Sequence, residues 1–221
     1  MNYLTHKLLN SEELEILRKN LEKESLNWED GKLTAGKHAA KEKNNLQLRR
    51  DSDLSIKLSG LITNKILKNE LIKSFALPKK IHGTIFSKSK SGMKYGRHID
   101  NAFMSSGRAD LSFTIFLNCK DDYKGGELSI ESFNSEEKFK LNAGEIIIYP
   151  STYLHSVEEV SNGERLVFIG WIESYVKSIE EREYLFDLDA AARSLLAKYG
   201  RSSEVDLIYK SYSNLLRRLG S

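Results

Sequence analysis

The spacing of apolar residues in this chain changes at Pro78, and this change limits the possible folds more than any other feature. Over residues 81–85 and 111–117 every second residue is apolar or glycine, a pattern typical of strands that bury one face. Short runs of the same kind follow at intervals of roughly 8–12 residues, separated by turn residues, which favours an antiparallel barrel or sandwich. The turn signals are Lys124–Gly126, Asn134–Glu137 and Asn142–Gly144. We therefore predict a double-stranded β-helix, or jelly roll, over residues 79–176 as the core of an α+β fold.

The residues before this core predict a support region, residues 1–78, that packs on the sheet. A leucine stripe predicts a first helix over about residues 11–24. Residues 28–43 lack periodicity and suggest strand and loop with turns at Gly31 and Gly36, and residues 43–48 are expected to be extended. From Asp51 to Phe75 apolar residues recur every three or four positions, which predicts one long amphipathic helix lying against the sheet.

Helical spacing returns after residue 177. Apolar positions from Tyr184 to Tyr199 form one face that Gly200 closes, and a second helix is expected from Ser203 to Gly220. We predict that residues 177–221 form a small helical extension. It could pack on the jelly roll or form a homo-oligomer, and the sequence leaves both open.

A candidate metal site lies in the segment Tyr95–Asp100. Side chains alternate along a strand, so His98 and Asp100 would project to the same side, about 6–7 Å apart at their Cα atoms. His155 follows the apolar run 145–154 and could supply a third ligand. Two histidines and one carboxylate suit a non-haem Fe(II) oxygenase, because they leave positions open for a co-substrate and dioxygen. The alternative is a surface histidine near a solvated acid, since short motifs often match by chance.

Arg165 supports a metal site over a surface cluster. It opens the apolar strand 165–172, where an unpaired buried charge would cost several kcal/mol. In the same cavity its planar guanidinium could hold a dicarboxylate by two parallel hydrogen bonds. A hydrolytic zinc site would also use histidines and an acid, but the chain has no HExxH helix, and hydrolysis gives Arg165 no evident role.

The sequence resembles the bacterial PKHD-type hydroxylases, in the prolyl 4-hydroxylase-like branch of the 2-oxoglutarate and Fe(II)-dependent dioxygenases. The family's spaced pattern matches Gly92, Tyr95, His98, Asp100, His155 and Arg165. The similarity also covers Lys43–Asn45, Gly125–Leu128, Tyr149–Ser151 and Leu185–Asp189, and so spans nearly the whole chain. Relatives often carry a tyrosine that helps to hold the co-substrate at the position of Ser89.

The resemblance implies an oxygenase that hydroxylates an unactivated C–H bond and releases succinate and carbon dioxide. His98, Asp100 and His155 would bind Fe(II) and Arg165 would bind 2-oxoglutarate, with dioxygen as partner and L-ascorbate as a further cofactor. Tyr95 would either donate to the co-substrate or belong to the core. The substrate would be a peptidyl proline or lysine, an amino acid or another small molecule. The alternative is a non-catalytic jelly-roll binding module whose metal centre is lost or structural.

Composition excludes several other classes. The chain has 34 basic and 31 acidic residues, a formal charge of +3, so no nucleic-acid partner is expected. A single cysteine, Cys119, excludes an intrachain disulfide and suggests a reducing compartment. No signal peptide and no apolar run of about 20 residues is seen, so we expect a soluble, cytoplasmic protein without a membrane partner.

Three further segments allow smaller predictions. Lys43–Asn45 suggests either a polar strand edge or, through the resemblance, residues that face the substrate. The segment Asn101–Asp110 is a candidate flap over the site. His82 opens a strand and is expected to be structural.

Overall fold

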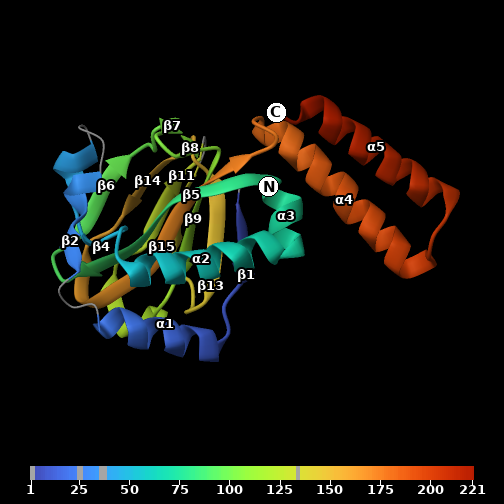
Figure 1. Ribbon diagram of the computed structural model, residues 1–221. Helices are drawn as coiled ribbons and strands as arrows, with labels where there is room; N and C mark the ends of the chain where they lie inside the picture. The colour runs from blue at the N-terminus through green and yellow to red at the C-terminus, as the bar shows by residue number, and fades with distance from the viewer. Residues whose placement is uncertain (1–2, 24–26, 35–38, 133–134) are drawn as a thin grey trace.

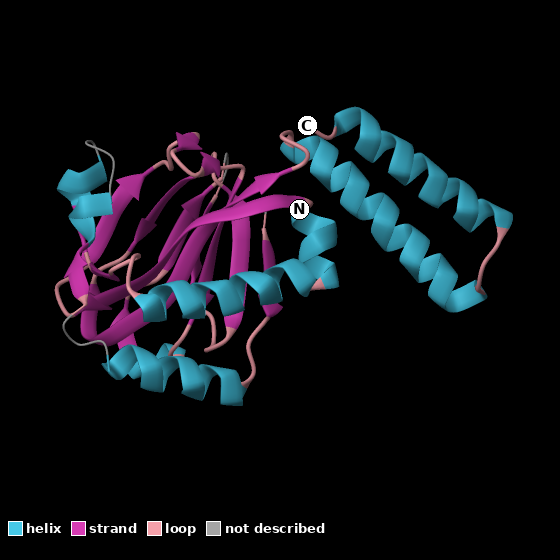
Figure 2. Cartoon of the chain, in the orientation of Figure 1, coloured by secondary structure: helices cyan, strands magenta, loops and turns pink. Residues whose placement is uncertain are grey.

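Two antiparallel β-sheets packed face to face form the body of the protein in a computed structural model, which describes residues 3–23, 27–34, 39–132 and 135–221 (Figures 1 and 2). The larger sheet has the strand order β1 (Leu4–Lys7), β13 (Glu145–Pro150), β9 (Leu111–Phe116), β15 (Val160–Ser174), β5 (Pro78–Lys90), β4 (Leu46–Leu48) and β2 (Trp28–Asp30), and β10 (Tyr123–Gly125) also pairs with β15. The smaller sheet has the order β12 (Glu136–Phe139), β11 (Leu128–Glu131), β14 (Leu154–Val157), β6 (Lys94–His98) and β3 (Lys43–Asn44). This arrangement confirms the predicted α+β jelly roll.

Alternation along β13 shows how the larger sheet separates two cores. Ile146 and Ile148 belong to the apolar cluster beneath the helices, whereas Ile147 and Tyr149 belong to the cluster between the two sheets. Leu128 and other residues of the smaller sheet complete the second cluster. Because side chains alternate in this way, one run of consecutive apolar residues fills both layers.

Helices α1 (Ser11–Lys23) and α2 (Asp53–Lys68) cover the outer face of the larger sheet (Figure 1). Reciprocal hydrogen bonds cap α1, because the Glu13 amide donates to Asn10 Oδ1 at 2.9 Å and the Asn10 amide donates to Glu13 Oε2 at 2.8 Å. Ser52 caps α2.

The prediction of one continuous helix from Asp51 to Phe75 is wrong. Asn69 takes an extended conformation with ψ of 117°, and its side-chain oxygen accepts from the Ile72 amide at 3.0 Å, so it ends α2 and begins a separate helix, α3 (Glu70–Ala76). Asparagine is among the preferred helix-capping residues, and here the cap breaks an otherwise regular apolar stripe.

The segment between β2 and β3 contains two short 3-10 helices, η1 (Gly31–Thr34) and η2 (Ala39–Glu42), where the sequence suggested strand and loop. The turn at Gly31 is therefore the start of η1. The extended stretch expected over residues 43–48 is confirmed as β3 and β4. The turn expected at Gly36, and the first residue of the turn at Asn134, lie outside the described residues.

The C-terminal extension consists of α4 (Ile179–Tyr199) and α5 (Ser203–Leu219), a helix pair that projects away from the sheets (Figure 1). Its base is held by a buried hydrogen bond of 2.5 Å from Ser74 Oγ to Asp189 Oδ2 and by an apolar cluster around Leu185. In the described part of the chain no helix is long and apolar enough to cross a membrane.

Candidate metal and co-substrate site

His98 and His155 face each other across two neighbouring strands, β6 and β14, as direct partners in the ladder. The ring Nδ1 of His98 lies 2.8 Å from the carbonyl oxygen of Gly96, and that of His155 lies 3.1 Å from the carbonyl oxygen of Tyr153. A carbonyl can only accept, so each Nδ1 carries a proton, and in the neutral form of each ring it is Nε2 that has the lone pair. Both histidines therefore have the orientation and tautomer that metal ligands need.

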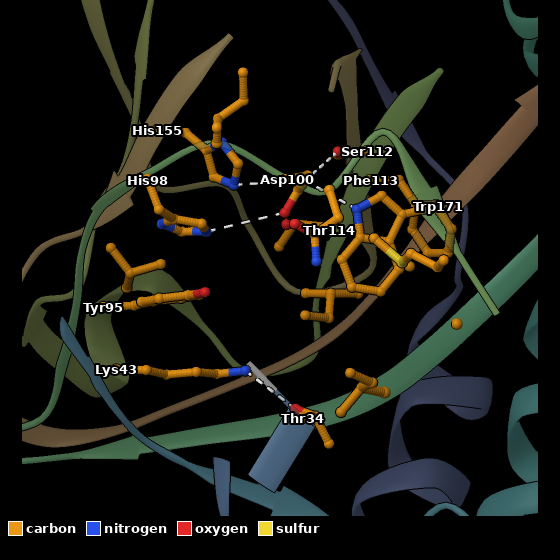
Figure 3. Close-up of a pocket in the computed structure, with 18 of the residues that line it drawn as sticks. Thr34, Lys43, Tyr95, His98, Asp100, Ser112, Phe113, Thr114, His155 and Trp171 are labelled. Atoms are coloured by element: carbon orange, nitrogen blue, oxygen red, sulfur yellow. Dashed lines mark hydrogen bonds and ion pairs between the residues drawn. The ribbon is translucent and has the colours of Figure 1, made fainter. Parts of the chain in front are cut away.

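Asp100 completes the cluster from a position beyond the strand. The sequence placed it on an extended strand with His98, but β6 ends at His98, and Asp100 lies in the following loop. Its Oδ1 lies 4.0 Å from His98 Nε2 and its Oδ2 lies 3.7 Å from His155 Nε2 (Figure 3). Ligand atoms of the three residues all lie within 4.8 Å of one another, close enough to share one cation.

Two neighbours fix the Asp100 carboxylate, and the sequence analysis missed both. Trp171 Nε1 donates to Asp100 Oδ2 at 2.9 Å, and Ser112 Oγ donates to the same oxygen at 2.7 Å (Figure 3). Ser112 Oγ also lies 2.7 Å from Ser151 Oγ. The sequence did contain a signal for Trp171: it is six residues after Arg165, and because side chains alternate along a strand, it faces the same side of β15.

Burial keeps the ring of His98 neutral. Desolvation, followed by the charge of neighbouring His155, lowers the pKa of His98 to about 4. Tyr95 stacks on the same ring, and burial raises the pKa of its phenol well above the usual range. At neutral pH the site thus presents neutral imidazole and a protonated phenol whose hydroxyl points into the cavity (Figure 3).

Arg165 reaches the same cavity from β15 and is 3% exposed. Its guanidinium lies 5.6 Å from the ring centre of Phe116, and its Nε has no hydrogen-bond partner among the described residues. Gly126, with φ of 70°, closely approaches the arginine, since a Cβ there would lie 3.0 Å from Arg165 Cδ. Ser89 is buried and is the cross-strand partner of Arg165. A buried arginine without an anionic partner is a ready binding group for a carboxylate.

The cavity that contains these groups has a volume of about 640 Å³. The segment 101–110, expected to be a flap, forms a short hairpin of β7 (Phe103–Met104) and β8 (Gly107–Arg108) on the cavity wall. His82 holds this hairpin, because its Nδ1 lies 2.9 Å from Ser106 Oγ and its Nε2 lies 2.8 Å from the Arg108 carbonyl oxygen. His82 is thus structural, as predicted.

The segment Lys43–Asn45 is not a simple polar strand edge. Lys43 and Asn45 are 5% and 7% exposed, while Asn44 is exposed. Asn45 Nδ2 donates to Ser87 Oγ at 2.7 Å. Lys43 lines the cavity beside Thr34 and Tyr95 (Figure 3). One of the three residues therefore faces the site.

Comparison with known proteins gives consistent matches. Residues 84–173 match the model of the 2OG-Fe(II) oxygenase superfamily, and residues 180–220 match that of the PKHD-type hydroxylase C-terminal domain. PKHD-type hydroxylases of Prochlorococcus marinus strains MIT 9215 and MIT 9312 are 74% and 72% identical to the chain, and each match covers 100% of both chains.

Solved structures show the same fold at low identity. A prolyl hydroxylase from Trichoplax adhaerens, in complex with a peptide fragment of the hypoxia inducible factor oxygen degradation domain, has a TM-score of 0.57 and 15% identity over 83% of this chain and 86% of its own. A Pseudomonas putida prolyl-4-hydroxylase has a TM-score of 0.54 and 18% identity over 78% of this chain and 92% of its own.

Proposed function

The chain belongs to the PKHD-type hydroxylases of the 2OG-Fe(II) oxygenase superfamily, and from this premise we propose that it hydroxylates an unactivated C–H bond while 2-oxoglutarate is converted to succinate and carbon dioxide. The family implies Fe(II) and 2-oxoglutarate. Bound together, they supply an oxidising power that no amino-acid side chain has. The residues of this chain bind and orient the reactants.

The donor set fits Fe(II). His98, Asp100 and His155 offer two imidazole nitrogens and one carboxylate oxygen, a combination typical of non-haem iron oxygenases. Backbone carbonyls orient the two imidazoles, and Trp171 orients the carboxylate. Such outer contacts commonly change metal affinity by about 10- to 100-fold.

Arg165 fits one end of 2-oxoglutarate. Its buried guanidinium forms no ion pair with another described residue and lines the same cavity as the three ligands, so a carboxylate there would balance its charge. Tyr95 has a hydroxyl in that cavity and is a candidate second donor. Ser89, where relatives often have tyrosine, is the buried cross-strand partner of Arg165 and supplies no phenol.

The observation that carries the proposal is the presence of both groups in one cavity: three possible metal ligands whose atoms lie within 4.8 Å of one another, and a buried arginine that forms no ion pair with another described residue. A non-catalytic module with a structural metal would need the three ligands, but it would not need the buried arginine beside them. The substrate remains a choice between a peptidyl side chain, such as proline or lysine, and a free amino acid or other small molecule. The names of the structural relatives mention prolyl hydroxylation, which for this chain is a proposal only.

The proposal can be tested in two stages. Anaerobic calorimetry should detect one Fe(II) per chain and then one 2-oxoglutarate that requires the metal. Aerobic incubation with Fe(II), ascorbate and 2-oxoglutarate should then release succinate, and addition of a compound that the enzyme hydroxylates should increase that release. Failure to bind iron anaerobically would contradict the proposal. Ascorbate as the physiological reductant, and a cytoplasmic location, stay predictions.

A further inference from the structure

Two cations in the cavity have no part in the proposed iron and co-substrate site. Lys43 and Arg50 line its wall near Thr34, and neither forms an ion pair with another described residue. Lys43 Nζ donates to Thr34 Oγ1 at 3.2 Å and lies 5.1 Å from the centre of the Tyr95 ring. One neutral acceptor leaves the ammonium group with unused donors.

The charges of the proposed complex leave these cations unbalanced. Apart from the two histidines proposed as metal ligands, the charged side chains on the cavity wall are Lys43, Arg50, Asp100 and Arg165. The two positive charges of Fe(II) and that of Arg165 balance Asp100 and the two carboxylates of 2-oxoglutarate. Lys43 and Arg50 then remain as excess positive charge for whatever else enters the cavity.

Lys43 and Arg165 also lie in different surroundings. Arg165 is next to Phe116 and Gly126 in the interior between the sheets. Lys43 lies beyond the Tyr95 ring from His98, so that Lys43, Tyr95 and His98 form successive layers and the ends of Lys43 and Tyr95 both point into the cavity (Figure 3). This arrangement separates the lysine from the arginine that the proposed function assigns to 2-oxoglutarate.

We propose that the substrate carries a carboxylate, which Lys43 binds inside the cavity while Arg50 attracts it at the exposed edge. This inference rests on the proposed function and narrows its substrate class. Burial, and then the charge of Arg50, lower the pKa of Lys43 to about 8. The charged form of this lysine is therefore unfavourable in the empty cavity, and a bound anion would offset that cost. The carboxylate belongs either to a small free acid or to an acidic side chain or terminus of a peptide.

Matched pairs of acids and primary amides test the proposal. The full-length protein is loaded anaerobically with Mn(II), a paramagnetic substitute for Fe(II), and with saturating 2-oxoglutarate. Ligand-observed NMR then measures binding and Mn(II)-induced relaxation for N-acetyl-proline against its amide, and for a blocked Ala-Glu-Ala peptide against Ala-Gln-Ala. The first pair represents small acids and the second represents peptides.

We expect the acid of at least one pair to bind about 10- to 100-fold more tightly than its amide, the range expected for a desolvated charge-assisted hydrogen bond. Lys43→Met should remove the preference, Lys43→Arg should retain most of it, and both should bind Mn(II) and 2-oxoglutarate normally. Lys32→Met, a nearby exposed lysine in η1 that does not line the cavity, is the matched control.

Several outcomes would overturn the inference: equal binding of acids and amides, no binding of any acid, or an acid preference that survives Lys43→Met. Loss of 2-oxoglutarate affinity in Lys43→Met would also overturn it, because the lysine would then serve the co-substrate. A wild-type protein that binds neither Mn(II) nor 2-oxoglutarate would contradict the proposed function instead.

Discussion

The ring of Tyr95 lies flat on the imidazole of His98, with 3.7 Å between ring centres and 20° between planes. The stack restricts rotation of the imidazole, whose Nδ1 is already bonded to the Gly96 carbonyl. Tyr95 therefore offers two separable functions: its ring orients a proposed ligand, and its hydroxyl faces the cavity.

Substitutions at Tyr95 should separate these functions. Tyr95→Phe keeps the stack, so Fe(II) affinity should stay within about threefold, while 2-oxoglutarate affinity should fall about 5- to 10-fold through loss of one hydrogen bond. Tyr95→Ala should weaken both. Anaerobic calorimetry with each ligand measures the two affinities. Unchanged 2-oxoglutarate binding in Tyr95→Phe would assign the residue to packing alone.

Trp171→Phe should weaken Fe(II) binding by about 10- to 100-fold, because the indole N–H that holds Asp100 is lost while most of the ring remains. Trp28→Phe is the matched control, since Trp28 Nε1 has no hydrogen-bond partner among the described residues. Metal titration and thermal melting of both variants distinguish a ligand effect from general destabilisation. Equal Fe(II) affinities in the two variants would show that the hydrogen bond to Asp100 is unimportant.

Substitution of the metal-binding residues and substitution of Arg165 should affect different binding steps. His98→Ala and Asp100→Ala should abolish measurable Fe(II) binding. Arg165→Met should retain iron and weaken 2-oxoglutarate by at least about 100-fold, since a desolvated, charge-assisted pair is lost. Equilibrium dialysis with labelled 2-oxoglutarate provides the measurement. Full co-substrate affinity in Arg165→Met would remove the role assigned to Arg165.

Lys43→Met should stabilise the folded protein at pH 7 by about 1–3 kcal/mol, because a 5% exposed charge is replaced by an apolar side chain of similar length. The pKa of Lys43 is about 8 in the folded chain against an ordinary 10.5, so the folded state binds the proton less tightly. The penalty is complete below pH 8 and disappears as the pH rises towards 10.5. Urea unfolding of both proteins at pH 7 and pH 10 should show a smaller difference at the higher pH. A stability difference independent of pH would mean that packing causes it.

The periodic parts of the fold could be predicted because each element buries one face. Alternation in residues 111–117 identified β9, and the helical stripes identified α1, α4 and α5. The break between α2 and α3 could not be found in this way, because the apolar spacing continues past Asn69 and the signal is a single capping side chain. Helix-breaking glycine or proline is absent there.

Prediction of the site was limited by contacts between distant strands. The sequence brought His98, Asp100, His155 and Arg165 into one cavity, and the structure places all four on its wall. The partners of Asp100 come from β9 and β15, and their identity depends on how the two sheets are aligned, which spacing within one strand does not specify. For the same reason the sequence left Lys43 between a polar strand edge and a substrate-facing role, since its burial depends on pairing with Tyr95 on β6.

The two imidazoles belong to paired strands, whereas Asp100 lies in a loop and is held by side-chain hydrogen bonds from Trp171 and Ser112. The backbone pairing of two strands therefore holds the two histidines, whereas only side-chain contacts hold the carboxylate. On heating or in mild denaturant, Asp100 should move away from the two histidines before the paired strands separate. A chain that has lost its cation in this way would retain an intact histidine pair, ready to capture the next ion as soon as the loop closes again.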